Sequence, residues 1–89
     1  MNLRTIILAF LAERYPAAYA ENTVLQRVNK CGLLDAPATQ DQVREELRTL
    51  ANRFKMADPA LDRVSGAVYW TATEEGVEQW HLDGQTHVG

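Results

Sequence analysis

The sequence predicts an α+β domain made of a three-helix bundle, a small antiparallel β-hairpin and a C-terminal helix. Three segments with helical patterning come first, because their apolar residues recur every three or four positions. The run VYWTATEEG, residues 68–76, then changes from a strand pattern to a helix start. Thr73 has the side chain of an N-cap, and Glu74 and Glu75 follow in the first turn, where the helix dipole favours negative charge. A strand therefore leads directly into the last helix.

The first helix is expected from about Asn2 to Arg14. Pro16 helps to end it, because a proline disfavours helical geometry at the preceding residue. The start of the chain, a basic residue and then an apolar run, superficially resembles a signal peptide. Glu13 interrupts that run and the apolar residues keep helical spacing, so we interpret the segment as a core helix.

The second helix is expected to begin at Glu21 or Asn22 and to end at Lys30. Asn22 is the expected N-cap, and Gly32 lies where a left-handed cap would follow the last turn. The link PAAYA before this helix is short and apolar, so it is expected to pack against the domain.

The third helix is the best defined and is expected from Thr39 to Arg53. Thr39 and Gln42 form a capping-box pattern at its start. Four apolar residues at spacings of four, three and four predict one core-facing stripe: Val43, Leu47, Leu50 and Phe54. Core packing is also expected for Trp70 and Trp80, in preference to a role as stacking platforms for single-stranded nucleic acid.

A hairpin is expected between the third and last helices. Its first strand is predicted over Lys55 to Ala57, and ADPALDRVSG, residues 57–66, would form its tip. The return strand would begin at Val64 or Ala67. Val77 and Trp80 would supply the buried side of the last helix. Residues 1–84 are thus expected to form one domain, and residues 85–89 a flexible tail.

Composition is consistent with one small domain but argues against an obvious nucleic-acid binder. The chain has 89 residues, of which 46% are hydrophobic, and its net charge is −3. Dedicated nucleic-acid-binding proteins are usually basic. The acidic residues gather near the C-terminus, and no Lys or Arg follows Arg63. The net negative charge therefore lies largely at the C-terminal end of the chain, where four acidic residues and no Lys or Arg follow Arg63.

Several functional classes find no support in the sequence. The single cysteine, Cys31, excludes an internal disulfide and a metal cluster around it, and His81 and His87 are expected in a solvated tail. We find no nucleophile motif, phosphate-binding loop or metal-binding histidine pair, so no enzyme activity, metal or cofactor is expected. No apolar stretch is long enough to span a bilayer, and a cytoplasmic location is expected.

The segment from Val43 to Gly76 resembles the winged helix-turn-helix regulators of bacteria and phages. The family often shows an L-x-x-L near the end of its third helix, a wing with Asp and Arg, and a closing Y-x-L-T-x-x-G. Here Leu47 to Leu50 matches the first feature, Asp62-Arg63 the second, and Trp70 to Gly76 the third. Ala72 stands where the family usually has leucine, and Trp70 where it has tyrosine. The order of elements extends the resemblance to most of the chain.

The resemblance implies that the third helix enters the major groove of DNA and that the wing approaches the backbone or minor groove. Arginine suits guanine, and the amides of Asn and Gln suit adenine. The side chains then expected to reach bases are Gln40, Arg44, Arg48 and Asn52. Lys55 and Arg63 would contact phosphates or the minor groove.

Two functional hypotheses remain open at this point. The first is a sequence-specific regulator that binds double-stranded DNA, as a homodimer joined through Ile7, Phe10 or Trp80 if these are exposed. The second is a winged-helix module that binds protein in a larger, phage-derived assembly. Asp41 and Glu45 favour the second, because they would lie near Arg44 and Arg48 and repel phosphates. The plain alternative to both is a solvated helix face of mixed charge.

Overall fold

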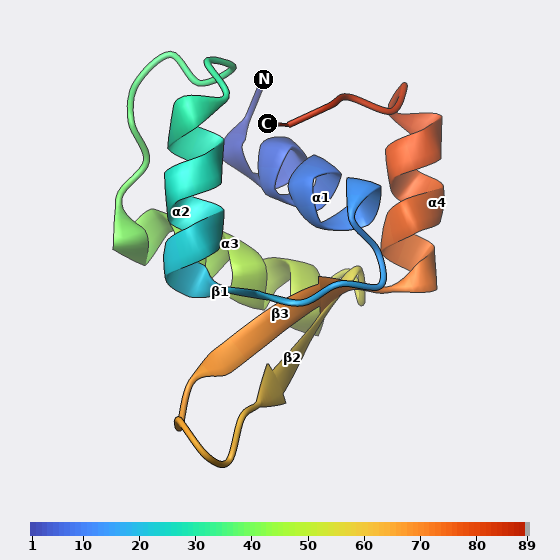
Figure 1. Ribbon diagram of the computed structural model, residues 1–89. Coiled ribbons are helices and arrows are strands. Elements are labelled where there is room, and N and C mark those ends of the chain that lie inside the picture. The colour runs from blue at the N-terminus through green and yellow to red at the C-terminus, as the bar shows by residue number, and fades with distance from the viewer. Residues whose placement is uncertain (89) are drawn as a thin grey trace.

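The computed structural model describes residues 1–88, which form four helices and a three-stranded antiparallel sheet (Figure 1). The predicted α+β class is confirmed. In chain order the elements are α1 (Leu3–Glu13), β1 (Tyr19–Ala20), α2 (Glu21–Lys30), α3 (Gln40–Asn52), β2 (Ala57–Leu61), β3 (Val68–Ala72) and α4 (Glu74–Leu82). The helices gather around α1, and the β2–β3 hairpin projects beyond them (Figure 1).

Helix α1 forms the centre of the core. Residues 6–12 are all buried, so this helix is apolar around its whole circumference, as expected of a helix surrounded by other elements. Full burial of a large apolar side chain such as that of Phe10 stabilises the fold by about 1.5–3 kcal/mol. Ile7 and Phe10 are completely buried, so neither can form a dimer surface.

Two of the three predicted N-caps are confirmed. Thr39 and Gln42 form the reciprocal capping box at the start of α3, and the Thr73 hydroxyl accepts a hydrogen bond from the Gly76 N–H at 3.1 Å. The prediction that Asn22 caps α2 is wrong. That helix begins at Glu21, directly after β1, and its N-cap Ala20 offers no side-chain hydrogen bond.

The core face of α3 is shorter than predicted. Val43, Leu47 and Leu50 are buried, which confirms the stripe over most of its length. The prediction that Phe54 packs in the core is wrong, since the residue is 36% exposed. Its ring lies near the guanidinium groups of Arg4 and Arg53, whose central carbons are 5.2 and 5.5 Å from the ring centroid. Both distances fall within the cation–π range.

The sheet differs from the expected two-stranded hairpin. A third strand, β1, pairs with β3, and the strand order is β1-β3-β2. Strand β2 covers Ala57–Leu61, not Lys55 to Ala57, because Lys55 turns the chain with a φ of 58°. Pro59 fits inside β2 because this strand lies at the edge of the sheet, where one side needs no ladder hydrogen bonds.

The hairpin tip is therefore shorter than predicted, and the return strand begins at Val68. Asp62 organises the tip: its carboxylate accepts hydrogen bonds from the Val64 N–H at 3.0 Å and the Ser65 hydroxyl at 2.9 Å. These bonds hold the pKa of Asp62 below its usual value.

The segment after α4, predicted to be a flexible tail, is hydrogen-bonded to α4 over residues 85–86 and to α1 over residues 87–88. The Trp80 indole N–H donates to the Thr86 carbonyl at 2.9 Å. The Val88 N–H donates to the Glu13 carboxylate at 3.1 Å, and the Val88 side chain is fully buried. Gly89, the last residue of the predicted tail, lies outside the described residues. No helix in residues 1–88 is long and apolar enough to cross a membrane.

Acid is expected to release this C-terminal segment. Burial raises the pKa of Glu13, but the hydrogen bonds with His87 and the Val88 N–H together lower it by more. The pKa therefore lies below its ordinary value of 4.5. The stabilisation from the carboxylate is therefore complete above about pH 4.5 and is lost as the pH falls through the lower, folded-state pKa. NMR should show the Val88 amide shift titrating below pH 4.5. In Glu13→Gln that titration should disappear, and a midpoint above pH 4.5 in the wild type would contradict the proposed contact.

Candidate nucleic-acid interface

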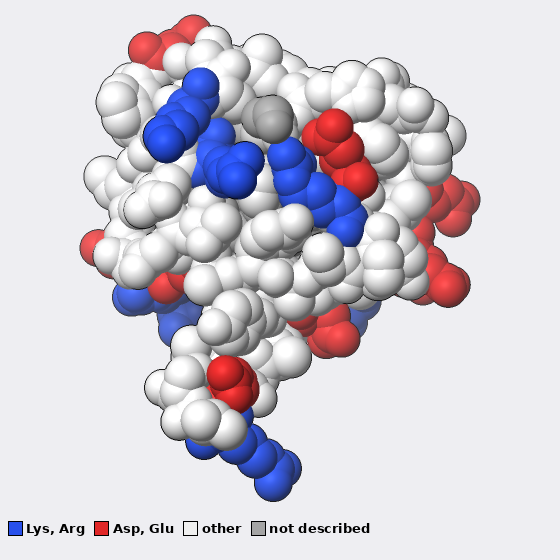
Figure 2. Space-filling model, in the orientation of Figure 1, with Lys and Arg blue, Asp and Glu red and all other residues white. Residues whose placement is uncertain are grey.

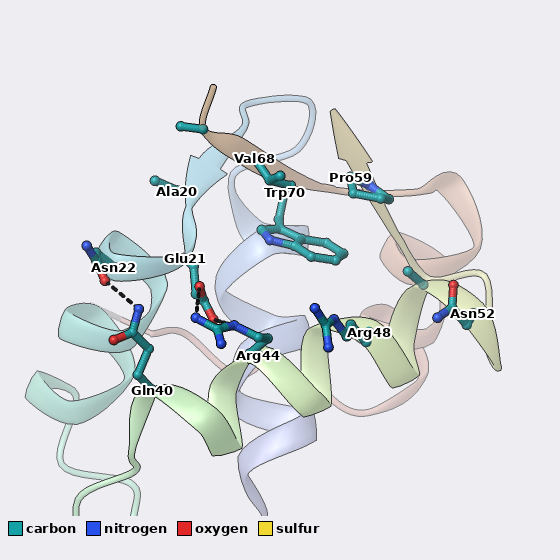
Figure 3. Close-up of a pocket in the computed structure, with 12 residues that line it drawn as sticks. Ala20, Glu21, Asn22, Gln40, Arg44, Arg48, Asn52, Pro59, Val68 and Trp70 are labelled. Carbon is teal, nitrogen blue, oxygen red and sulfur yellow. Dashed lines mark hydrogen bonds and ion pairs between the residues drawn. The ribbon is translucent and has the colours of Figure 1, made fainter. Parts of the chain in front are cut away.

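Four of the six predicted site residues lie in one groove. Gln40, Arg44, Arg48 and Asn52 follow one another at every fourth position of α3, so their side chains share a face of the helix. All four line a groove of about 550 Å³ between α3, the start of α2 and the hairpin (Figure 3). The remaining lining residues are Ala20, Glu21, Asn22, Ala51, Pro59, Ala67, Val68 and Trp70.

Trp70 forms the apolar floor of this groove. Its indole reaches from β3 towards α3 (Figure 3), and the residue is only 8% exposed. Across the sheet it is paired with Tyr19 on one side and Pro59 on the other. The predicted core role of Trp70 is confirmed.

Arg44 is paired with Glu21, a residue that no pattern in the sequence links to the site. Arg44 Nε lies 2.9 Å from Glu21 Oε1, and Arg44 Nη2 lies 3.3 Å from Glu21 Oε2. This is the two-bonded geometry in which a guanidinium and a carboxylate interact most strongly. The hydrogen bonds and the charge of Glu21 raise the pKa of Arg44 above its usual value.

The other groove residues of α3 differ in how firmly they are held. The Gln40 amide donates a hydrogen bond to the Asn22 side chain at 3.3 Å, so Asn22 belongs to the site and not to the cap of α2. Arg48 and Asn52 are exposed. Within residues 1–88, Arg48 has no hydrogen bond or ion pair, and its cationic group can contact a ligand without losing another partner.

Lys55 and Arg63 do not line the groove. Lys55 is exposed in the turn between α3 and β2, and Arg63 is exposed in the hairpin tip. Figure 2 shows a basic side chain at the far end of the hairpin, and Arg63 is the only Lys or Arg after Lys55 in the sequence. Both side chains are therefore open to solvent but contribute nothing to the groove lining.

The acidic residues of α3 lie mostly outside the groove. Glu45 lines a separate concavity with Leu3 and Leu34. Asp41 is not a lining residue either, but its carboxylate lies 3.8 Å from Nη1 of Arg44, which does line the groove. The expected repulsion of phosphates by Glu45 thus does not apply to the groove itself. Its charged lining residues are two arginines and Glu21.

No protein-family model matches the chain, and comparison with curated proteins found no match. Within the part of the chain that the structure describes, no group of three His, Cys, Asp or Glu side chains could hold a metal ion. The arrangement offers hydrogen-bond donors, amides and, among the described residues, one unpaired cation, Arg48, in an open groove. Such groups suit the binding of an anionic polymer that also presents hydrogen-bond donors and acceptors, as the base edges of DNA do.

Proposed function

We propose that the protein is a winged-helix DNA-binding protein, a small cytoplasmic regulator that places α3 in the major groove. The observation that carries this proposal is the common groove shared by Gln40, Arg44, Arg48 and Asn52. The order of three helices, hairpin and C-terminal helix supports the winged-helix identity. The projecting hairpin would act as the wing, with Arg63 at its tip near the DNA backbone.

The dimensions of α3 are compatible with this role. From Gln40 to Asn52 the helix rises by about 18 Å, at about 1.5 Å per residue. The major groove of B-DNA is about 12 Å wide and accepts a helix. The four side chains would therefore face the DNA over several successive base pairs, where they can reach base edges or phosphates, and Lys55 and Arg63 would add phosphate contacts.

Fluorescence anisotropy with labelled duplex DNA tests this proposal. We expect binding at low salt to a randomised duplex pool and tighter binding after selection. If three to five phosphates are contacted, the logarithm of affinity should fall against the logarithm of salt with a slope of about −3 to −4.5. Absence of binding to duplex DNA at low salt would reject the proposal.

A second candidate, a module that binds protein, is favoured by the apolar surface of the hairpin. Leu61, Val64 and Val68 are 63%, 97% and 40% exposed. A double variant, Leu61→Ser with Val64→Ser, should keep DNA binding if α3 carries it. If this variant no longer binds a partner protein but still binds DNA, the hairpin carries the protein contact.

A homodimer would form more readily through α4 than through α1, because Leu82 on α4 is 76% exposed. Two copies would present two α3 helices to half-sites about one DNA turn apart. Analytical sedimentation with and without DNA measures whether the protein is a monomer or a dimer.

A further inference from the structure

The ion pair between Arg44 and Glu21 uses only one edge of the guanidinium. A guanidinium carries five N–H donors, and Glu21 engages those on the Nε and Nη2 side. The edge formed by Nη1 and the second hydrogen of Nη2 stays outside this pair. Asp41 is the nearest anion to Nη1, but at 3.8 Å it is beyond hydrogen-bond distance. The Arg44 side chain is 43% exposed and the Asp41 side chain beside Nη1 is 95% exposed, so this open edge lies close to solvent.

We infer that Arg44 reads guanine and that Glu21 is a positioning residue that holds it for this purpose. The inference rests on the proposed DNA-binding function. The open edge presents two parallel N–H donors, which match the O6 and N7 acceptors of guanine in the major groove. Adenine presents an N6 amino donor in place of O6, so a guanidinium fixed in this orientation would set a donor against a donor.

Holding the side chain in place is what makes this discrimination effective. A mobile arginine can turn away from the wrong base and bind a neighbouring phosphate, which carries no sequence information. Glu21 restricts that escape, because two hydrogen bonds fix both the position and the plane of the guanidinium. Arg48 has no such partner within residues 1–88 and is suited to phosphate contact. The two arginines of the groove thus divide specificity and affinity between them.

The alternative role for Glu21 is to mask Arg44 from DNA. The two roles predict different results for Glu21→Gln, which removes one negative charge from the groove. A positioning role predicts that binding to unrelated duplexes stays equal or rises, while the preference for guanine over adenine at one base position falls about tenfold. A masking role predicts that affinity rises by the same factor for all duplexes.

The experiment selects binding sites from a randomised duplex pool with the wild type and three variants. Arg44→Lys keeps the charge but removes the fork of donors, so it should erase guanine preference at one position. Glu21→Gln should weaken guanine preference at that same position and leave the others intact. Glu45→Gln is the matched control, because it removes one carboxylate of α3 that lies outside the groove. It should change no base preference.

The possible failures can be distinguished. If the wild type binds no duplex, both the proposed function and this inference are wrong. If the wild type selects a sequence but Glu21→Gln keeps its full guanine preference, only the inference is overturned. A uniform gain in affinity with an unchanged selected sequence would also overturn it, in favour of masking. Thermal unfolding of each variant confirms that the compared proteins are folded.

Discussion

Replacing Gly76 with alanine is expected to lower the free energy of unfolding by about 3 kcal/mol, the upper part of the range for overpacking. An added Cβ would lie 2.4 Å from the Met56 carbonyl oxygen and 3.2 Å from Leu8 Cδ1. The Leu8 methyl group can move, but the Met56 backbone is held on both sides. Its carbonyl accepts the Thr73 N–H at 3.0 Å, and its N–H donates to the Leu50 carbonyl at 2.9 Å. The clash can therefore be relieved only by displacing α4.

Thermal and urea unfolding monitored by circular dichroism measure this effect. For a domain of this size, 3 kcal/mol corresponds to a fall in Tm of about 12–24 °C. Glu75→Ala is the control, because Glu75 is exposed in the same first turn of α4 and should change stability by less than about 1 kcal/mol. Equal midpoints for the two variants would show that α4 does not approach Met56 as closely as described.

The close approach of α4 to the Met56 backbone explains the T-x-x-G pattern at residues 73–76. Thr73 caps α4 and also donates its hydroxyl hydrogen to the Lys55 carbonyl at 2.6 Å. Gly76 then allows the helix to lie directly on Met56. Residues 55 and 56 lead from α3 into β2, so the pattern fixes where the hairpin leaves the helices. It contributes to the groove by positioning one of its walls, without contacting a ligand.

Local patterns were sufficient to predict most of the helices but not the full sheet. The capping box of Thr39 and the stripe from Val43 to Leu50 depend on spacings within one helix, which can be read directly from the sequence. Strand β1 has only two residues, too few to show any alternation. The delayed start of β2 depends on a positive φ at Lys55, a conformation that lysine does not favour and that tertiary contacts impose.

In the candidate site, too, local patterns predicted the helical face but not the tertiary contacts. Helical periodicity alone placed Gln40, Arg44, Arg48 and Asn52 on one face of α3. The partner of Arg44 could not be predicted in this way, because Glu21 is 23 residues away and reaches the groove only through the packing of α2 on α3. The separation of Glu45 from the groove likewise depends on segments of the protein that pack beside α3. Leu3 and Leu34 form its concavity from segments distant in sequence.

Replacing Arg48 with alanine is expected to weaken binding to duplex DNA by about 10- to 100-fold. One hydrogen bond to a charged group contributes about 1.5–3 kcal/mol, and the loss should be nearly uniform across sequences if Arg48 contacts phosphate. The salt slope should become shallower by about 1. The fold should be unaffected, because Arg48 is exposed and makes no polar contact with the other described residues.

Arg27→Ala is the matched control for this measurement. Arg27 is also an exposed arginine on a helix, but it does not line the groove, so its removal changes net charge equally without removing a groove contact. At physiological salt, charges farther than about 8 Å from the DNA are largely screened, and affinity should change by less than about threefold. Equal losses in the two variants would mean that bulk charge drives binding. In that case α3 would not be the DNA-reading helix.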